Sequence, residues 1–551
     1  MIEKIVDWSA NNKFIVLTFF AILIAVGVWA VQTTPLDAIP DLSDNQVIVF
    51  AEYMGRSPQT VEDQVTFPLV TALQGLAKVK AVRATSMFGM SFIYIIFNDD
   101  VDYYWARSRV LEKLSSIQST LPTGAKTVLG PDGTGVGHVF WYTVESKDQD
   151  LASLRTIQDW FIKPQLQSVE GVAEVASIGG YVKQYQVSVD PKKMLSLGVS
   201  ISDIRQATMR ANNDVGGKVT EVNEREHFVR GQGYFTSRND IENVVLKNKG
   251  SIPVLIKDIA TVVMTADIRR GSMEKNGEGQ VTGGIIVMRL GENAEGVIQR
   301  VKAKIEELKP GLPKGVSIIP SYDRSELIEA SVDNLLRTLI EEAIIVTLVV
   351  LLFLMHLPSA LRIIIEIPVS VFIAFLMMRV VGITSNIMSL GGIAIAIGVL
   401  IDASIVMLEN AHRHLAEAQQ LKAEKGIEFS YQEVIIRSVK QVARAIFFST
   451  LIIIVSFLPV FLLSGQEGKL FHPLAFTKTF ALIGSAIVSV TLIPVLMTLV
   501  MRGRFKKEED HKLSAFFINM YKPVIRWSLK HRKTILALNV LALVIAIPIG
   551  L

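Results

Sequence analysis

Seven apolar stretches limit how this chain can fold more than any other feature of its sequence. Each is long enough to cross the ~30 Å hydrocarbon core of a bilayer, which takes about 20 helical residues. They cover approximately residues 14–32, 336–356, 363–381, 387–408, 446–464, 474–501 and 534–551. The first stretch follows Lys4 and Lys13 and is not followed by a small-residue cleavage site, so we expect an uncleaved signal-anchor.

The charged residues indicate which side of the membrane each loop occupies. One-fifth of the residues are charged and half are apolar, so the chain alternates between membrane and water-exposed blocks. With a cytoplasmic N-terminus, the short loops on that side carry most of the Lys and Arg residues, as cytoplasmic loops generally do. These residues are Arg362, Arg413, Lys422, Lys425, Arg437, Lys440, Arg444, Arg502, Arg504, Lys506, Lys507 and Lys512. The block from about 33 to 335 is therefore expected in the periplasm of a Gram-negative cell. The net charge of +4 then reflects the basic residues of the cytoplasmic loops. Because the sequence shows no continuous cluster of Lys and Arg residues that would bind a phosphate backbone, we expect no nucleic-acid partner.

The expected periplasmic block contains an internal repeat. The segment Gly75–Arg83 matches Gly171–Gly179 at a spacing of 96 residues. Each match follows an amphipathic helical stretch (57–73, 151–169) and precedes an alternating strand (91–97, 184–189). A further strand–helix–strand pattern covers 283–288, 294–308 and 316–320. These patterns predict ferredoxin-like α+β repeats, with the polar, strand-forming stretch 182–272 as an insertion.

Asp402 is a lone carboxylate inside the apolar run 391–410. A charged side chain at mid-bilayer costs roughly 2.5–3.5 kcal/mol on insertion scales, so its presence there suggests a function. A carboxyl group that alternates between neutral and charged forms suits a proton-driven machine. Three glycines of the same run, Gly391, Gly392 and Gly398, are expected to allow close helix packing.

Several motifs together resemble the heavy-metal-efflux branch of the resistance-nodulation-division (RND) transporters. The resemblance covers essentially the whole chain, and its residues are Thr34–Ser43, Tyr103–Val110, Tyr322–Ser325, Asn386–Gly392, Asp402–His412, Gly465–Gly468 and Pro473–Thr479. It implies a polytopic α-helical membrane protein with a periplasmic α+β region, the RND porter fold. RND transporters have twelve membrane helices and two exported blocks, so the chain is similar to an N-terminal half. A C-terminal half, a homotrimer, a periplasmic adaptor and an outer-membrane channel are the partners that the resemblance implies.

The resemblance also implies a division of the chain into regions. Residues 1–32 form the cytoplasmic N-terminus and first membrane helix. Porter repeat one and the start of repeat two occupy 33–181, a docking-type insertion occupies 182–272, and 273–335 completes repeat two. Membrane helices two to six occupy 336–501, and an amphipathic segment at 502–533 lies on the cytoplasmic leaflet. A seventh membrane helix covers 534–551, where the sequence ends.

The resemblance gives roles to three charged residues. Asp402 matches the acid that the family uses for proton coupling. Glu409 lies two helical turns further, about 10 Å by rise, and either passes protons to the cytoplasm or sits in an interface with Asn410 and His412. Lys478 either extends its amine to the membrane interface or pairs with a carboxylate inside the bundle. Glu366 is expected at the cytoplasmic interface.

No metal class is identified by the available ligands. The chain has no cysteine, so a metal would need carboxylates, imidazoles or thioethers. Met388, Met407 and Met497 match positions of the methionine ladder of copper and silver exporters, while Ile268, Leu400 and Leu482 replace other members of it. Ala396 stands where zinc, cobalt and cadmium exporters carry an extra acid. Met87 and Met90 are expected to serve packing.

These observations predict a secondary transporter of the inner membrane that exports heavy-metal cations by proton antiport. No ATP-binding signature is present, and the glycine-rich run 130–138 lacks the Lys-Ser/Thr that follows in a phosphate loop. We therefore expect neither enzymatic activity nor a cofactor. Two alternatives stay open: an RND exporter of organic solutes or drugs, and a non-transporting membrane scaffold of RND architecture.

Overall fold

A computed structural model describes residues 2–249, 252–269, 271–354, 363–503, 505 and 512–550. The chain divides into two compact units. The first unit comprises 1–136, 290–296 and 324–551, and the second comprises 137–289 and 297–323. Each unit is described by itself below.

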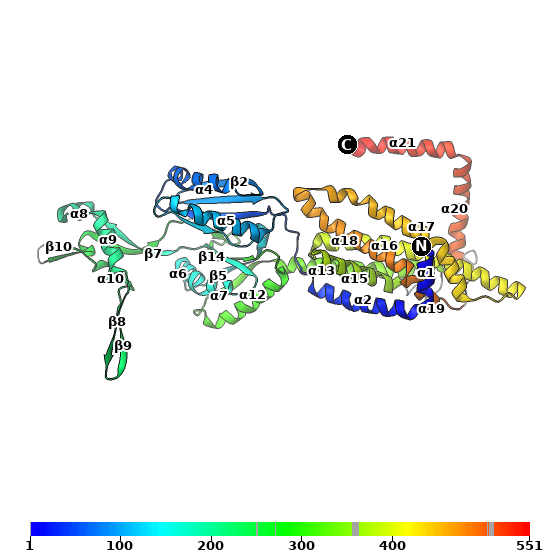
Figure 1. The fold of residues 1–551 in the computed structure, drawn as a ribbon, viewed down its shortest axis with the longest axis horizontal. Coiled ribbons are helices and arrows are strands. Elements are labelled where there is room, and N and C mark those ends of the chain that lie inside the picture. Colours follow the sequence, from blue (N-terminus) through cyan, green and yellow to red (C-terminus); the bar gives the residue numbers. More distant parts are fainter. Residues whose placement is uncertain are drawn as a thin grey trace. The chain divides into compact units, whose positions relative to one another are not determined.

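Repeat one is a four-stranded antiparallel sheet in the first unit (blue to cyan in Figure 1). Its strands are β1 (Gln46–Glu52), β2 (Val79–Met87), β3 (Met90–Phe97) and β4 (Lys126–Leu129), in the order β2-β3-β1-β4. The helical stretch α3 (Pro58–Val61), η1 (Glu62–Thr66) and α4 (Phe67–Gln74) joins β1 to β2, and α5 (Tyr103–Ile117) joins β3 to β4. Alternate strand residues such as Val49, Ile93 and Ile95 are fully buried against these helices. This βαββαβ order is the ferredoxin-like arrangement.

Repeat two, in the second unit, has the same strand order. Its strands are β5 (His138–Glu145), β6 (Val172–Gly179), β14 (Gln280–Met288) and β15 (Ser317–Asp323), with β14 pairing both β6 and β5, and β5 pairing β15. The two-residue strand β13 (Met273–Glu274) also pairs with β14. Helices α6 (Leu151–Ile157), α7 (Lys163–Gln167) and α12 (Ala294–Leu308) provide the crossovers. The pattern read from 283 to 320 is therefore the second half of this repeat.

The first crossover of each repeat contains one π-helical turn. These turns are η1 (Glu62–Thr66) and η4 (Gln158–Ile162), which are 96 residues apart. Each is followed two residues later by a proline, Pro68 or Pro164. Proline has no N–H and its ring clashes with the carbonyl four residues earlier, so a locally wider turn lets the helix continue. The sequence repeat thus extends to a backbone irregularity.

The connection between β6 and β14 is a folded insertion. Strands β7 (Lys183–Val189) and β12 (Ala260–Ala266) pair antiparallel along their whole length. Between them lie α8 (Pro191–Leu197), α9 (Ile201–Ala211), α10 (Arg238–Glu242), β10 (Val245–Lys249), β11 (Ile252–Leu255) and α11 (Ile256–Ile259), around a small core with Ile256, Ile259 and Val262. The hairpin β8 (Val215–Val222) and β9 (Arg225–Gly231) is exposed throughout and projects from this core (Figure 1).

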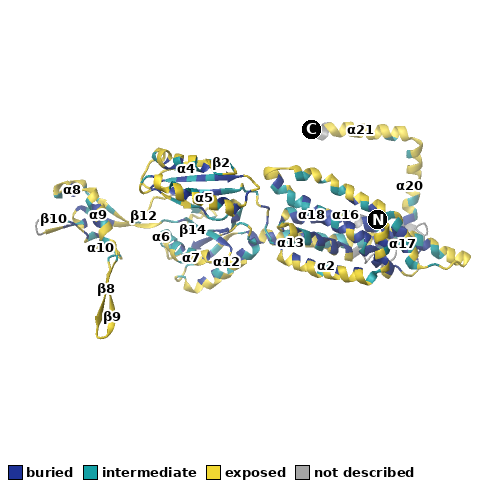
Figure 2. Ribbon diagram, viewed as in Figure 1, coloured by how far each residue is buried: buried dark blue, intermediate teal, exposed yellow. Residues whose placement is uncertain are grey.

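Eight of the remaining described helices of the first unit form an apolar bundle with its own core. They are α1 (Ile2–Asn11), α2 (Lys13–Thr33), α13 (Arg324–Leu354), α15 (Ile363–Val381), α16 (Ile387–Lys425), α17 (Tyr431–Ser456), α18 (Gly465–Val490) and α19 (Leu492–Val500). The helices α20 (Lys512–Lys530) and α21 (Arg532–Gly550) follow, and none of their described residues belongs to this core. Among the described residues, four segments are long and apolar enough to cross a membrane: Lys13–Thr33, Ile387–Lys425, Tyr431–Leu462 and Gly465–Val490. Half or more of the apolar window is buried in α16 and α18, but only 22% in α2, whose outer face is exposed (Figure 2). α16 and α18 are therefore the inner helices.

The predicted spans differ from the described helices at two places. The span expected at 474–501 is interrupted at Thr491, which separates α18 from α19. The span at 446–464 ends as the 3₁₀ turn η6 (Leu458–Leu462). Residues 355 and 356 of the second predicted span, and Leu551 of the seventh, lie outside the described residues.

Candidate functional site

The start of α16 is fixed by its cap and by a neighbouring segment. The side chain of Asn386 accepts hydrogen bonds from the backbone N–H groups of Met388 and Ser389, both at 3.0 Å, and Ser389 Oγ accepts one from the Asn386 N–H at 2.7 Å. This reciprocal capping box satisfies backbone donors at the helix start. The Asp37 N–H also donates to the Ser385 carbonyl at 2.9 Å, next to a parallel bridge between Leu36 and Ser385. The helix that carries Asp402 is therefore anchored at its N-terminal end.

Gly392 allows α16 and α18 to pack closely. A Cβ at this position would overlap Thr477 Oγ1 and lie 2.5 Å from the Leu474 carbonyl oxygen. The Thr477 hydroxyl donates to the Ser389 carbonyl at 2.8 Å, a bond between the two helices. The packing role predicted for Gly392 is confirmed. It is wrong for Gly391 and Gly398, where a Cβ would meet none of the described atoms within 4 Å.

A buried carboxylate of α15 is hydrogen-bonded to α16. Asp402 falls within α16, but its side chain lies outside the described part of the structure. Two residues further, Ser404 Oγ donates a hydrogen bond to Glu366 Oε2 in the first turn of α15, and Glu366 is only 2% exposed. The beginning of α15 therefore packs against α16, and the interfacial position expected for Glu366 stays a prediction. The sequence pattern that could have indicated the burial of Glu366 is a charged residue flanked by apolar residues on both sides, as at Asp402.

Lys478 is buried in α18 and lies over an aromatic ring. Its side chain is 7% exposed, and its Nζ lies 3.6 Å from the centre of the Phe457 ring. A desolvated ammonium over a ring face gains a cation–π attraction of about 2 kcal/mol. The structure therefore does not show the extension to the membrane interface. It shows no ion pair of Lys478 with a carboxylate among the described residues either.

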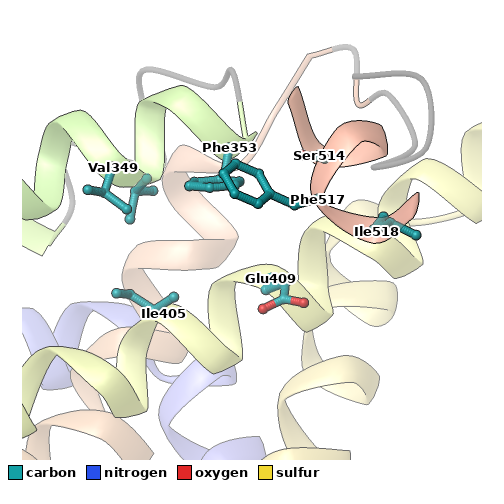
Figure 3. Close-up of a pocket in the computed structure, with 8 residues that line it drawn as sticks. Val349, Phe353, Ile405, Glu409, Ser514, Phe517 and Ile518 are labelled. Atoms are coloured by element: carbon teal, nitrogen blue, oxygen red, sulfur yellow. The ribbon is translucent and has the colours of Figure 1, made fainter. Parts of the chain in front are cut away.

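Glu409 lines a cavity rather than the buried interface of its neighbours. The cavity, of about 280 Å³, lies between α13, α16 and α20, and its lining is otherwise mainly apolar. Figure 3 shows Glu409 and Ile405 one turn apart on α16, below Phe353 and Phe517. Asn410, in contrast, is buried and donates to the Ser438 carbonyl of α17 at 2.7 Å. Glu409 thus reaches a space that its neighbour in sequence does not.

The three ladder methionines differ in burial. Met407 in α16 and Met497 in α19 are fully buried in the apolar core, while Met388 near the start of α16 is half-buried. Burial of this kind is also what packing alone gives, because methionine fills irregular core gaps. Within the described ranges, no group of three or more His, Asp or Glu side chains is placed to hold a metal ion.

Two ion pairs between distant residues were not predicted. Arg324 at the start of α13 lies 3.3 Å from Asp37, and both side chains are largely buried. Burial raises the pKa of Asp37, and the Arg324 guanidinium opposes that increase. Lys469 near the start of α18 contacts Asp99 of repeat one at 2.8 Å and donates to the Ser43 carbonyl at 2.8 Å. No local sequence pattern predicts such ion pairs.

Comparison with known proteins identifies the family. The sequence model of the AcrB/AcrD/AcrF family matches residues 5–550. The chain belongs to this family. The RND porter fold expected from the sequence is confirmed by this match and by the crystal structure of a heavy metal efflux pump, with a TM-score of 0.76 and 33% identity, which covers 90% of this chain and 48% of that one.

Several curated relatives are named for the transport of metal cations. The chain is 46% identical over 546 residues to the cation efflux system protein CusA of Escherichia coli K12, covering 98% of this chain and 52% of that protein. It is 32% identical to the cobalt-zinc-cadmium resistance protein CzcA of Cupriavidus metallidurans, covering 100% of this chain and 52% of that protein. The chain spans about half the length of these relatives.

Proposed function

We propose that the chain is part of a secondary transporter that exports heavy-metal cations from a Gram-negative cell. The observation that carries this proposal is the 46% identity, over 98% of the chain, to a protein named for cation efflux. Identity of this extent spans both the exported repeats and the membrane helices, so it is not confined to a shared scaffold. The relatives named for metal resistance favour metal cations over organic solutes.

We propose that Asp402 couples export to the proton gradient. A carboxyl group in the inner helix α16 is neutral when protonated and charged when ionised, so each proton that it takes up or releases changes the electrostatics of the bundle. Glu366, bonded to Ser404, and Lys478 over Phe457 are the charged groups that the structure places inside the same bundle. Glu409 lines a cavity two turns further along α16 and would receive the proton released towards the cytoplasm.

The assembly and the regions of the chain are also part of the proposal. The two βαββαβ repeats would be the porter subdomains, at 33–181 and 273–335, and the insertion at 182–272 would be the docking subdomain. The exposed β8–β9 hairpin supports a docking role, because a two-stranded ribbon gains stability by packing against a partner. We propose an inner-membrane homotrimer, completed by a C-terminal half, with a periplasmic adaptor and an outer-membrane channel as partners. The amphipathic α20 would lie on the cytoplasmic leaflet.

Replacement of the methionines Met388, Met407 and Met497 tests which metal the transporter carries. Replacing all three by Leu conserves volume and costs little stability, since single Leu/Met exchanges usually stay below about 1.5 kcal/mol. We expect metal export to survive this replacement. Collapse of copper or silver export alone, with another metal still exported, would show instead that the three thioethers line the path.

Growth of a strain deleted for the encoding gene tests the proposed function. We expect sensitivity to one or more of Cu, Ag, Zn, Co, Ni and Cd, with unchanged tolerance of a panel of drugs and detergents. Complementation by the gene should restore growth. Sensitivity to the drugs with normal tolerance of all six metals would overturn the proposal in favour of an exporter of organic solutes.

A further inference from the structure

Three methionines lie together at one end of the repeat-one sheet. Met87 and Met90 are direct partners across the β2–β3 hairpin, which turns through Phe88 and Gly89. Met54 follows β1, and a Cβ at Gly89 would lie 3.2 Å from its Sδ. The adjoining backbone is held by two hydrogen bonds, from the Tyr53 N–H to the Gly89 carbonyl at 2.9 Å and from the Gly89 N–H to the Arg56 carbonyl at 3.0 Å. The turn thus brings the end of β1 beside the paired methionines.

The methionine pair faces away from the helices of the repeat. The preceding pair, Ser86 and Ser91, lies on the helix side, because both hydroxyls contact Thr66 Oγ1 of η1 at 2.9 and 2.7 Å. Successive residues of a strand point to opposite faces, so Met87 and Met90 lie on the open face. Directly opposed residues of an antiparallel pair have Cβ atoms about 4.5–5.5 Å apart, well within the reach of two methionine side chains towards one ion.

Packing does not account for these side chains. Met87 is 51% exposed and Met54 is 58% exposed, whereas the core methionines Met407 and Met497 are fully buried. The packing role predicted for Met87 and Met90 is therefore wrong for Met87. The two exposed methionines adjoin each other at the turn, and contiguous exposed apolar surface is a feature of binding sites when the patch is large. The three polarisable sulfur atoms of Met54, Met87 and Met90 favour a soft ion, and thioethers select Cu(I) among the biological metals.

We propose that Met54, Met87 and Met90 form a three-thioether binding site for Cu(I), for which Ag(I) can substitute. The site lies in the exported repeat and is separate from the membrane methionines Met388, Met407 and Met497. Its biological meaning rests on the metal-export function proposed above. Binding by the purified chain is measured without transport, so the site and the transport function can fail independently.

Competition with a coloured Cu(I) chelator tests the site in the purified chain under reducing conditions. The variant Met54→Leu/Met87→Leu/Met90→Leu should lose one bound Cu(I) per chain, and Met87→Leu alone should weaken binding by about tenfold or more. X-ray absorption at the copper edge should show sulfur neighbours that the triple variant lacks. Zn(II), which thioethers bind poorly, should not displace the copper.

A matched variant controls for the loss of exposed thioethers as such. Met209, Met264 and Met520 are 65%, 55% and 55% exposed and lie in three different elements, α9, β12 and α20. Replacing these three by Leu should leave Cu(I) binding unchanged, and thermal unfolding should confirm that both triple variants are folded. Equal Cu(I) binding by wild type and the Met54/Met87/Met90 variant would overturn the proposal. The same result with a changed oligomeric state would assign the cluster to a protein contact.

Discussion

The two sheet repeats share one plan and differ at one connection. Ala51 pairs with Ser91 in repeat one, and Val144 pairs with Thr282 in repeat two, and all four residues are fully buried. The offset between the repeats is thus 93 residues in the first strand and 191 in the third, so repeat two carries 98 additional residues. These residues all lie between β6 and β14, where repeat one has the short turn between Met87 and Met90. The same point of the fold carries an exposed methionine turn in one copy and a folded insertion in the other.

The difference shows where this fold tolerates change. A hairpin turn lies beyond the paired residues of both strands, so a long excursion there disturbs neither the register nor the core. The sheet interiors also differ, but by compensated exchanges. Val49 pairs with Ile93 in repeat one, whereas Tyr142 pairs with Gly284 at the corresponding place in repeat two. A large side chain on one strand is accommodated by glycine on the next.

Exchanging that interior pair should give the largest effect on stability. Tyr142 is fully buried, its hydroxyl donates to Gln158 Oε1 at 3.0 Å, and a Cβ at Gly284 would lie 2.6 Å from its Cζ. Gly284→Ile should therefore lower the free energy of unfolding by about 1–3 kcal/mol through overpacking. Adding Tyr142→Val, which recreates the repeat-one pair Val49–Ile93, should recover part of the loss. Thermal unfolding measures both variants, and wild-type stability of Gly284→Ile alone would break the comparison.

A smaller effect on stability, but a large one on export, is expected at Lys469. This residue of α18 contacts Asp99 in repeat one, and the corresponding residue of repeat two, 191 residues later, is the apolar Leu290. Lys469→Met should change the free energy of unfolding by less than about 1 kcal/mol, because the pair is partly exposed. It should reduce metal export if α18 moves repeat one through this contact, and Lys469→Arg should retain export.

The ion pair of Lys78 with Asp100 is the matched control. It lies in the same repeat, is more exposed and does not involve a membrane helix. Lys78→Met should leave both metal export and stability unchanged. Equal export by Lys469→Met and wild type would show that the α18 contact is only structural.

The smallest effect on repeat two is expected from removal of its insertion. Replacing residues 179–282 by residues 86–91 of repeat one, whose end residues pair in the same way, should leave the β5–β14 pairing and the packing around Tyr142 intact. The thermal unfolding midpoint of the shortened chain should fall less than that of Gly284→Ile. A larger fall would show that the insertion supports the sheet, contrary to the comparison.

Local sequence patterns predicted the elements of the fold well. The helix expected at 294–308 coincides with α12, and the membrane span expected at 363–381 coincides with α15. Periodicity and spacing are properties of short segments, so they can be read without knowing the fold. The break at Thr491 was missed, because an apolar run does not distinguish one helix from two.

The contacts of the candidate site could be predicted less well. Asp402 was identified because a charge in an apolar run is costly wherever the helix packs. The burial of Glu366 was not predicted, because it depends on Ser404 in the next helix. Lys469 and Asp99 lie 370 residues apart, and Met54 reaches Met87 only through the hairpin turn. Such pairs depend on tertiary packing, for which the sequence carries no local signal.

Proton flux in everted membrane vesicles tests the central claim most directly. At equal membrane abundance, vesicles with wild-type protein should take up metal when a pH gradient is imposed, and adding metal should release protons. Asp402→Asn should abolish both fluxes, because the amide resembles only the protonated carboxyl group and cannot release a proton. Glu409→Gln should lower both fluxes less, since the Glu409 carboxylate lines a cavity between α13, α16 and α20. Metal-dependent proton flux of wild-type size in Asp402→Asn would contradict the account.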